Sequence, residues 1–523
     1  MPALAPEPET RQSTNLIIGA VAAVLLLASL GQTIVSTALP TIVGELGGLD
    51  HLTWVVTAYL LSSTVVAPIY GKLGDLYGRK IVLQAAILIF LGGAVLSGLA
   101  TSMTFLIIAR AVQGLGGGGL MVVAMTVVAD VIPPRQRGKV QGLFGSVFGV
   151  ATIVGPLLGG FFVEHLSWHW IFFANLPIGV LALSVIALAF RQKPERQSHK
   201  IDYLGAVLLT GTLSSVVLFT SLGGNTFPWT SLPIVTLMVM SAVFLVAFIV
   251  VEARAPEPML PLQLFANRTF LVSIGVLFIV GLAMFGSTTF LPLFLQTAKG
   301  ISPSASGMQL LPMMVGMFGA SILSGQFMSR TGHYKALPIF GTAMMVVGLA
   351  LLGTMQLDTD SLVIGLYMFI FGVGLGPINT VAITATQNAV PQNLLGVATA
   401  GTTLFRQIGG SIGVSVFGAI FSARLVAELG GAMPEGGTSA AFNSQALAAL
   451  PPAAHQMILE AFARALHPVF FVAAGASVLA FLLTWLLKEV PLATTLRKEP
   501  RAEIEAEENA AAAVTGAPAY ARG

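Results

Sequence analysis

Charged side chains in the segment GKLGDLYGRK, residues 71–80, could link two neighbouring helices electrostatically. Asp75 lies beside a turn that Gly74 and Gly78 allow, and Arg79 follows four residues later. A carboxylate in such a turn can cap the first turn of a nearby helix and pair with a loop arginine. We therefore expect a latch between helices here. The alternative is a solvated loop whose basic residues only set membrane topology.

The elements that must position this segment are membrane-spanning helices. Of the 523 residues, 55% are hydrophobic and only 9% are charged, whereas a globular surface needs about a quarter of its residues charged. Apolar stretches of about 20 residues, each long enough to cross a bilayer, recur along the chain. We therefore predict an all-α polytopic membrane protein. The absence of cysteine excludes a disulfide framework and a thiolate metal site, and the net charge of +3 is too small to suggest nucleic acid.

Fourteen apolar runs are bounded by glycine, proline or charge, and we predict one transmembrane helix for each. The runs cover residues 15–38, 53–70, 80–99, 105–129, 139–162, 170–190, 202–221, 232–251, 270–295, 304–327, 336–355, 362–386, 397–422 and 467–487.

The distribution of basic residues predicts the orientation. With the N-terminus inside, 20 of the 25 Lys and Arg residues lie on the cytoplasmic side, and only Arg110 and Arg406 fall within spans. The positive-inside rule then places both termini in the cytoplasm, as expected for a multi-pass protein of a cell inner membrane. Residues 1–14 lack the charged start and cleavage site of a secretory signal.

The two halves of the chain contain an internal repeat. Gly71 and Gly78 match Gly325 and Gly332 at an offset of 254 residues, and Ser329 stands where the first half has Asp75. Parallel halves around a central cavity are the architecture of many secondary transporters. We therefore expect five segments along the chain. They are a cytoplasmic segment (1–14), a six-helix bundle (15–195), two additional helices (196–260), a second six-helix bundle (261–490) with an external loop (423–466), and a disordered tail (491–523).

Within that external loop, two segments have apolar positions at helical spacing: AFNSQALAAL, residues 441–450, and HQMILEAFARALH, residues 455–467. A short helix at the membrane interface would explain this pattern. A solvated loop with helical propensity is the alternative.

GKLGDLYGRK resembles the signature loop of the major facilitator superfamily, which carries two glycines at the places of Gly71 and Gly78. The segments ARAVQGLGGGG, GVATIVGPLLGG, SWHWIFFANLPIG and LFRQIGGSIGVSVFG are similar to segments of its fourteen-span drug:proton antiporters of the EmrB/QacA type. The resemblance covers residues 15–487. It implies the major facilitator fold: two six-helix bundles plus two extra central helices.

The resemblance also implies a function. It predicts a secondary active transporter that exports hydrophobic or amphipathic compounds by proton antiport through alternating access. Such a protein is not an enzyme, and it uses the proton gradient but needs no cofactor or metal. Its partners are small-molecule substrates, protons and the bilayer. Whether a periplasmic adaptor also binds is left undecided by the resemblance. The alternatives are an exporter of a specific endogenous lipid, siderophore or metabolite, and a facilitator without proton coupling.

Several residues receive roles from the resemblance. Asp130 should join Asp75 and Arg79 in one charge network, although local pairing with the arginines of PPRQRGK is an alternative. Arg110 and Gln113 correspond to a motif thought to take part in proton transfer; the alternative is that Arg110 binds carbonyl oxygens of neighbouring helices. The fifth-span pattern contributes helix packing and gating. Its residues are Gly155, Pro156, Gly159 and Gly160.

The first span departs from the family pattern. It carries Gly31 where the family commonly has an aspartate and Ser36 where it has an asparagine, and none of the 22 Asp and Glu residues falls in the middle of a predicted span. Glu164, at the outer end of the fifth span beside His165, is the remaining candidate for proton coupling. A surface carboxylate without a coupling role is the alternative.

Arg406 lies close to the membrane midplane and has no acidic residue at that depth. Its partners must therefore be carbonyls, amides, water or an anionic group of a substrate, and a helix-bridging role is the alternative. Neutral polar residues, together with methionines and phenylalanines, would complete a substrate cavity. The cavity candidates are Gln32, Thr33, Ser36, Asn379, Gln387, Arg406 and Gln407.

Overall fold

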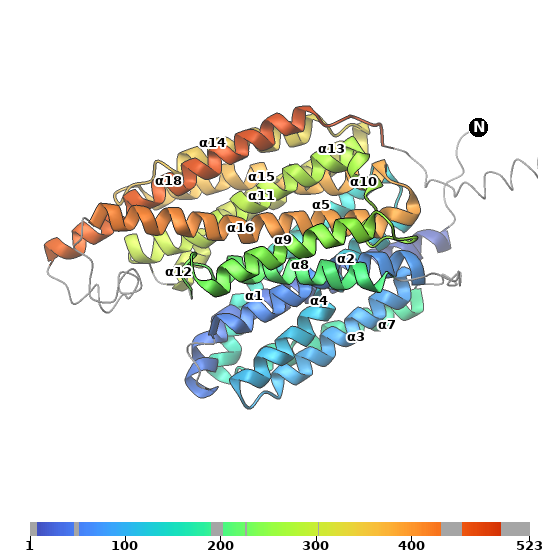
Figure 1. Ribbon diagram of the computed structural model, residues 1–523, viewed down its shortest axis with the longest axis horizontal. Helices are drawn as coiled ribbons and strands as arrows, with labels where there is room; N and C mark the ends of the chain where they lie inside the picture. Colours follow the sequence, from blue (N-terminus) through green and yellow to red (C-terminus); the bar gives the residue numbers. More distant parts are fainter. Residues whose placement is uncertain are drawn as a thin grey trace, which may run out of the picture.

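The computed structural model describes residues 8–46, 52–189, 202–224, 227–301, 303–429 and 452–492. Within these ranges the chain is helical and forms no strand beyond one isolated bridge (Figure 1). The prediction of an all-helical membrane protein is therefore confirmed. The predicted tail, residues 491–523, lies outside these ranges from residue 493, as does the loop from 430 to 451.

The first half of the chain contains six long helices and one short turn. They are α1 (Pro8–Leu46), α2 (Leu52–Tyr77), α3 (Arg79–Gly98), α4 (Met103–Val131), α5 (Pro134–His165), the short α6 (Trp170–Phe173) and α7 (Asn175–Ala189). Two further long helices follow, α8 (Tyr203–Leu222) and α9 (Leu232–Glu252), and then the short α10 (Gln263–Ala266).

The second half repeats the pattern. Its helices are α11 (Arg268–Leu293), extended by the π-helical η2 (Phe294–Ala298), α12 (Pro303–Gln309), α13 (Leu311–Thr331), α14 (Ala336–Leu352), α15 (Ser361–Ala389), η3 (Gln392–Leu394), α16 (Leu395–Leu429) and α18 (Pro452–Trp485). The expectation of a separate interfacial helix over 455–467 was wrong. These residues form the start of α18, because their apolar positions continue without a break into the last membrane helix.

Eleven helices in the described ranges are long and apolar enough to cross a membrane. Two shorter apolar stretches accompany them, Asn15–Gly31 within α1 and Ala336–Leu352, which is α14. The predicted count of fourteen spans therefore stays a prediction. α5 is a further long helix, and it carries no charged residue between Lys139 and Glu164.

The helices pack as two groups that contact each other directly. In the first group α4 contacts α1, α2 and α3, and α1 also contacts α5 and α7; in the second, α15 contacts α13 and α14, and α16 contacts α11 and α18. The α8–α9 pair, green in Figure 1, lies along the region where the groups meet, and α8 contacts both α2 and α16. The groups meet directly along two seams, α2–α16 and α5–α13.

Glycine pairs allow close approach at both seams. A Cβ atom on Gly71 would lie 2.7 Å from the carbonyl oxygen of Gly396, and one on Gly325 would lie 3.0 Å from the backbone nitrogen of Lys139, next to Gly138. Small residues let helix backbones approach in this way. Because Gly71 and Gly325 are related by the repeat offset, the two seams are equivalent positions of the two halves.

Candidate functional site

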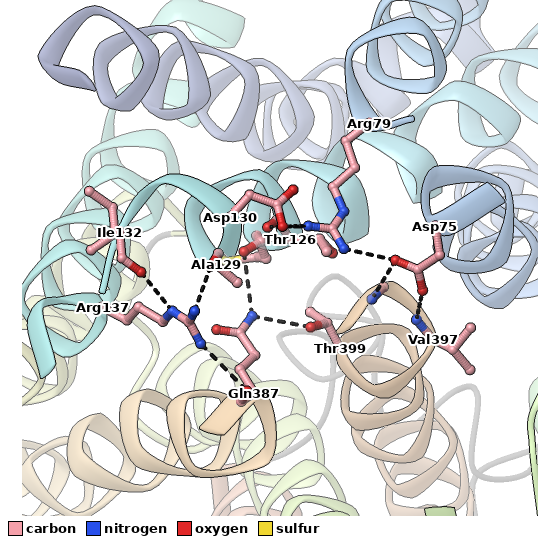
Figure 2. A network of polar contacts seen from close by, with 12 residues as sticks. Asp75, Arg79, Thr126, Ala129, Asp130, Ile132, Arg137, Gln387, Val397 and Thr399 are labelled. Carbon is pink, nitrogen blue, oxygen red and sulfur yellow. Dashed lines mark hydrogen bonds and ion pairs between the residues drawn. The ribbon is translucent and has the colours of Figure 1, made fainter. Parts of the chain in front are cut away.

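A buried charge network lies where α2, α3 and α4 end or begin (Figure 2). Gly78, with a φ of 86°, makes the sharp turn between α2 and α3, a conformation that favours glycine. The turn places Arg79 beside the last turn of α2, where its Nη2 donates to Oδ1 of Asp75 at 2.8 Å. Its Nη1 donates to the carbonyl oxygen of Thr126 at 3.3 Å and pairs with Asp130. The structure therefore brings together the three charges that the sequence grouped.

Asp75 also reaches across to the second half. Its Oδ1 accepts from the backbone N–H of Gly396 at 3.0 Å, and its Oδ2 accepts from that of Val397 at 3.1 Å. Because α16 begins at Leu395, these are first-turn N–H groups with no partner inside the helix. A negative charge there is also stabilised by the helix dipole. One carboxylate thus joins α2 to α16 across the first seam.

A second set of contacts extends the network to α15. Arg137 donates from Nε to the carbonyl oxygen of Ile132 at 2.9 Å and from Nη1 to that of Gln387 at 3.5 Å. The Gln387 amide donates to Oγ1 of Thr399 at 3.1 Å and to the carbonyl oxygen of Met125 at 3.4 Å. Gln387, expected in the substrate cavity, therefore lies in the network at the end of α15. Figure 2 shows both groups side by side.

Arg110 occupies a separate buried site and is 1% exposed. Its guanidinium donates to the carbonyl oxygens of Gly31 at 3.1 Å and Val55 at 3.3 Å, and to Oε1 of Gln113 at 2.6 Å. It also lies 4.4 Å from the ring centre of Tyr59. In the described ranges no carboxylate pairs with Arg110. The geometry matches the alternative in which this arginine binds carbonyl oxygens of neighbouring helices.

The place of the missing first-span acid is filled by an aromatic ring. A Cβ atom on Gly31 would lie 2.7 Å from Cζ of Phe90 on α3 and 3.6 Å from the amide nitrogen of Gln113. A larger residue at position 31 would therefore collide with that ring. The ring of Phe90 therefore reaches Gly31 and takes up the space that a longer side chain on α1 would need.

Two cavity candidates meet at Arg406 on α16. Its Nη1 donates to Oδ1 of Asn379 on α15 at 3.1 Å. Among the described residues, the buried Nε of Arg406 and Oε1 of Gln407 have no hydrogen-bond partner. The side chains of the other candidates, Gln32, Thr33 and Ser36, lie outside the described part of the structure. Within the described part of the chain, one donor of Arg406 therefore has no acceptor, and no acidic side chain pairs with its charge.

Glu164 is exposed in the last turn of α5, and no hydrogen bond or ion pair joins it to another described side chain. The neighbouring His165 contacts the carbonyl oxygen of Phe161 at 3.2 Å, and His169 contacts Ser167 at 2.7 Å. The geometry matches that of a surface carboxylate, and the coupling role stays a prediction.

The fifth-span pattern lies in one continuous helix, α5, with Gly155 and Gly159 buried and Gly160 partly exposed. The side chain of Pro156 is outside the described part.

Several residues that form buried polar contacts could not be identified from the sequence. The backbone N–H groups of Gly396 and Val397 have no side-chain signature that could have revealed them. The position of Arg137 shortly after Asp130 indicates a local ion pair. It does not indicate the contact with Gln387 of the other half. Glu45 accepts a hydrogen bond from the indole of the buried Trp168 at 2.7 Å, and no spacing in the sequence connects these two residues.

The chain is similar to known proteins over most of its length. A family model described as Major Facilitator Superfamily matches residues 21–414. The chain is 42% identical over 480 residues to an "Uncharacterized MFS-type transporter" of Mycobacterium tuberculosis, with 91% of this chain and 70% of the relative covered. It is 41% identical over 418 residues to the "Multidrug transporter protein MdtP" of Bacillus subtilis, with 80% and 77% covered.

It is also 33% identical over 503 residues to "Multidrug resistance protein 3" of Bacillus subtilis, with 94% of this chain and 98% of the relative covered. Among solved structures, the human organic anion transporter MFSD10 aligns with a TM-score of 0.61 at 15% identity, over 90% of this chain and 99% of that one. At that identity the likeness shows the fold alone.

Proposed function

The chain belongs to the major facilitator superfamily, and on this premise we propose that it exports hydrophobic or amphipathic compounds in exchange for protons. Members of this family are transporters and not enzymes. The names of the two Bacillus relatives support multidrug export. We further propose the fourteen-span arrangement of the EmrB/QacA type, in a cell inner membrane with both termini in the cytoplasm.

The observation that carries the proposal is the contact of Asp75 with the first turn of α16. It joins the two halves at one end of the molecule, the end that the basic residues assign to the cytoplasm. Opening this end requires the carboxylate to leave both N–H groups. A contact of this kind suits alternating access, in which two helix bundles rock against each other around a central substrate site.

Proton coupling is tested by efflux of lipophilic dyes from proteoliposomes, with and without an imposed proton gradient. Proton transfer by a positioned side chain contributes about 10²-fold or more, so Glu164→Gln is expected to lower gradient-driven efflux at least tenfold. Asp358→Asn, which neutralises another exposed carboxylate, is the matched control. Undiminished gradient-driven efflux in Glu164→Gln would move coupling to Asp75 or Asp130. No response to the gradient in the wild type would indicate a facilitator.

Arg406 is expected to select substrates by charge. Its Nε, which has no partner among the described residues, gives an anionic group of a substrate a donor and an opposite charge. Arg406→Gln should therefore weaken binding of an anionic lipophilic dye about tenfold, since a charge-assisted hydrogen bond contributes roughly 1.5–3 kcal/mol. Binding is measured by fluorescence titration of the purified protein. A neutral dye of similar size is the control, and equal loss for both dyes would indicate that Arg406 only bridges α15 and α16.

A further inference from the structure

A cavity of about 220 Å³ lies between α5 and α13, at the second seam. Lys139 of α5 lines one side, and Gln326, Ser329 and Arg330 of α13 line the other. Because its walls come from both halves of the chain, the cavity has this shape only while the two helices are together.

The cavity is the counterpart of the Asp75 contact in the other half. Ser329 stands at the position of Asp75, 254 residues later, and Gly325 stands at that of Gly71. At the first seam the Asp75 carboxylate fills the space between α2 and α16. At the second seam the shorter, neutral Ser329 leaves that space empty.

Positive charge surrounds the empty space. Lys139 and Arg330 are exposed, and neither forms an ion pair within 4.0 Å with any residue in the described ranges. Arg135 lies beside them and donates from Nε to the carbonyl oxygen of Ser329 at 2.9 Å. None of the three cations pairs with an acidic side chain in the described part of the chain. Like charges at this distance repel one another, so a bound anion would stabilise the closed seam.

The backbone N–H groups at the start of α5 are not available to bind an anion in the cavity. Because α5 begins at Pro134, Gly138 and Lys139 lie one turn inside the helix, where backbone N–H groups bond to the preceding turn. Any anion in the cavity would therefore be bound by the side chains of Lys139, Arg330, Ser329 and Gln326. Basic pockets between membrane helices on the cytoplasmic side bind acidic lipid headgroups in this way.

We propose that a phosphate group of an anionic phospholipid occupies this cavity in place of the missing carboxylate and stabilises the closed form of the α5–α13 seam. Free inorganic phosphate has the same chemistry. The lipid is favoured for two reasons. The helix α8 covers the first seam by packing on α2 and α16, whereas it does not cover the α5–α13 seam. The charged side chains of the cavity, Lys139 and Arg330, are also exposed at the surface. The lipid would belong to the cytoplasmic leaflet, an assignment that rests on the membrane orientation proposed above.

The test compares the full chain in nanodiscs of phosphatidylcholine alone and of phosphatidylcholine mixed with phosphatidylglycerol in equal parts. We expect phosphatidylglycerol to raise the Tm of the wild type by about 3 °C, measured by tryptophan fluorescence. The shift should vanish in Lys139→Gln/Arg330→Gln. It should persist in Arg254→Gln/Arg268→Gln, which removes the same charge from two exposed arginines outside the cavity.

Inorganic phosphate added to phosphatidylcholine nanodiscs separates the two sources. A shift with phosphate alone, lost in the cavity variant, would assign the site to a free anion, whereas a shift only with phosphatidylglycerol assigns it to the lipid. Equal phosphatidylglycerol shifts in the cavity variant and the control variant would overturn the proposal.

Ser329→Asp gives an independent test if the double variant folds poorly. It supplies the missing carboxylate to Lys139 and Arg330, so it should raise the Tm in phosphatidylcholine alone and remove the further gain from phosphatidylglycerol. A lower Tm combined with an unchanged phosphatidylglycerol shift would contradict an anion site. Neither measurement depends on transport, so failure here and failure of the export proposal are distinguishable.

Discussion

Replacing Asp75 by asparagine is expected to lower the turnover of dye export at least tenfold while changing substrate affinity less than about twofold. The asparagine keeps the shape but loses the charge that Arg79 and the first turn of α16 bind. Removing one partner of a buried ion pair costs about 3–5 kcal/mol, and each 1.4 kcal/mol is about a factor of ten in an equilibrium. The closed state of this end would therefore become at least about a hundredfold less populated, and the cycle would stall in its open state.

Turnover is measured in proteoliposomes, and affinity by titration of the purified protein. Glu489→Gln is the control, because this carboxylate at the same end pairs with an exposed histidine, and surface pairs contribute little. A fall in affinity as large as the fall in turnover would show that Asp75 acts in substrate binding and not as a latch.

Much of this site could be predicted because its charges are close in sequence. Asp75 and Arg79 are separated by one helix turn and a glycine, so one short motif contains two of the three charges. Asp130 lies near the end of the helix that packs on both α2 and α3. The helical class followed from apolar length alone. The limits of the last helix did not, because α18 takes in residues 455–467, whose spacing suits an interfacial helix equally well.

The contacts between the halves could not be predicted. Asp75 lies 321 residues from Gly396, and the groups that it binds are backbone amides, which every residue other than proline has. Helix periodicity shows which face is apolar but not which distant helix covers it. The same limit applies to Arg137 and Gln387, whose contact joins helices 250 residues apart.

The second large effect is expected at Arg110. Its guanidinium binds α1 through Gly31, α2 through Val55 and its own helix through Gln113. Arg110→Gln leaves two backbone carbonyls and one amide oxygen without this donor, and each buried unsatisfied group costs about 1–3 kcal/mol. We expect the Tm to fall by roughly 5–10 °C, measured by tryptophan fluorescence, and dye export to be lost.

Arg110→Lys separates a packing role from proton transfer. Lysine keeps the positive charge, but its single ammonium group cannot reproduce the fork that reaches Gly31 and Val55 at once. If Arg110 serves as the donor that joins three helices, the lysine variant loses thermal stability nearly as far as the glutamine variant. If it serves in proton transfer, the lysine variant keeps its Tm and loses only the response of efflux to the gradient. Because the described acceptors are uncharged and Phe90 fills the space of the missing acid, we expect the loss of stability.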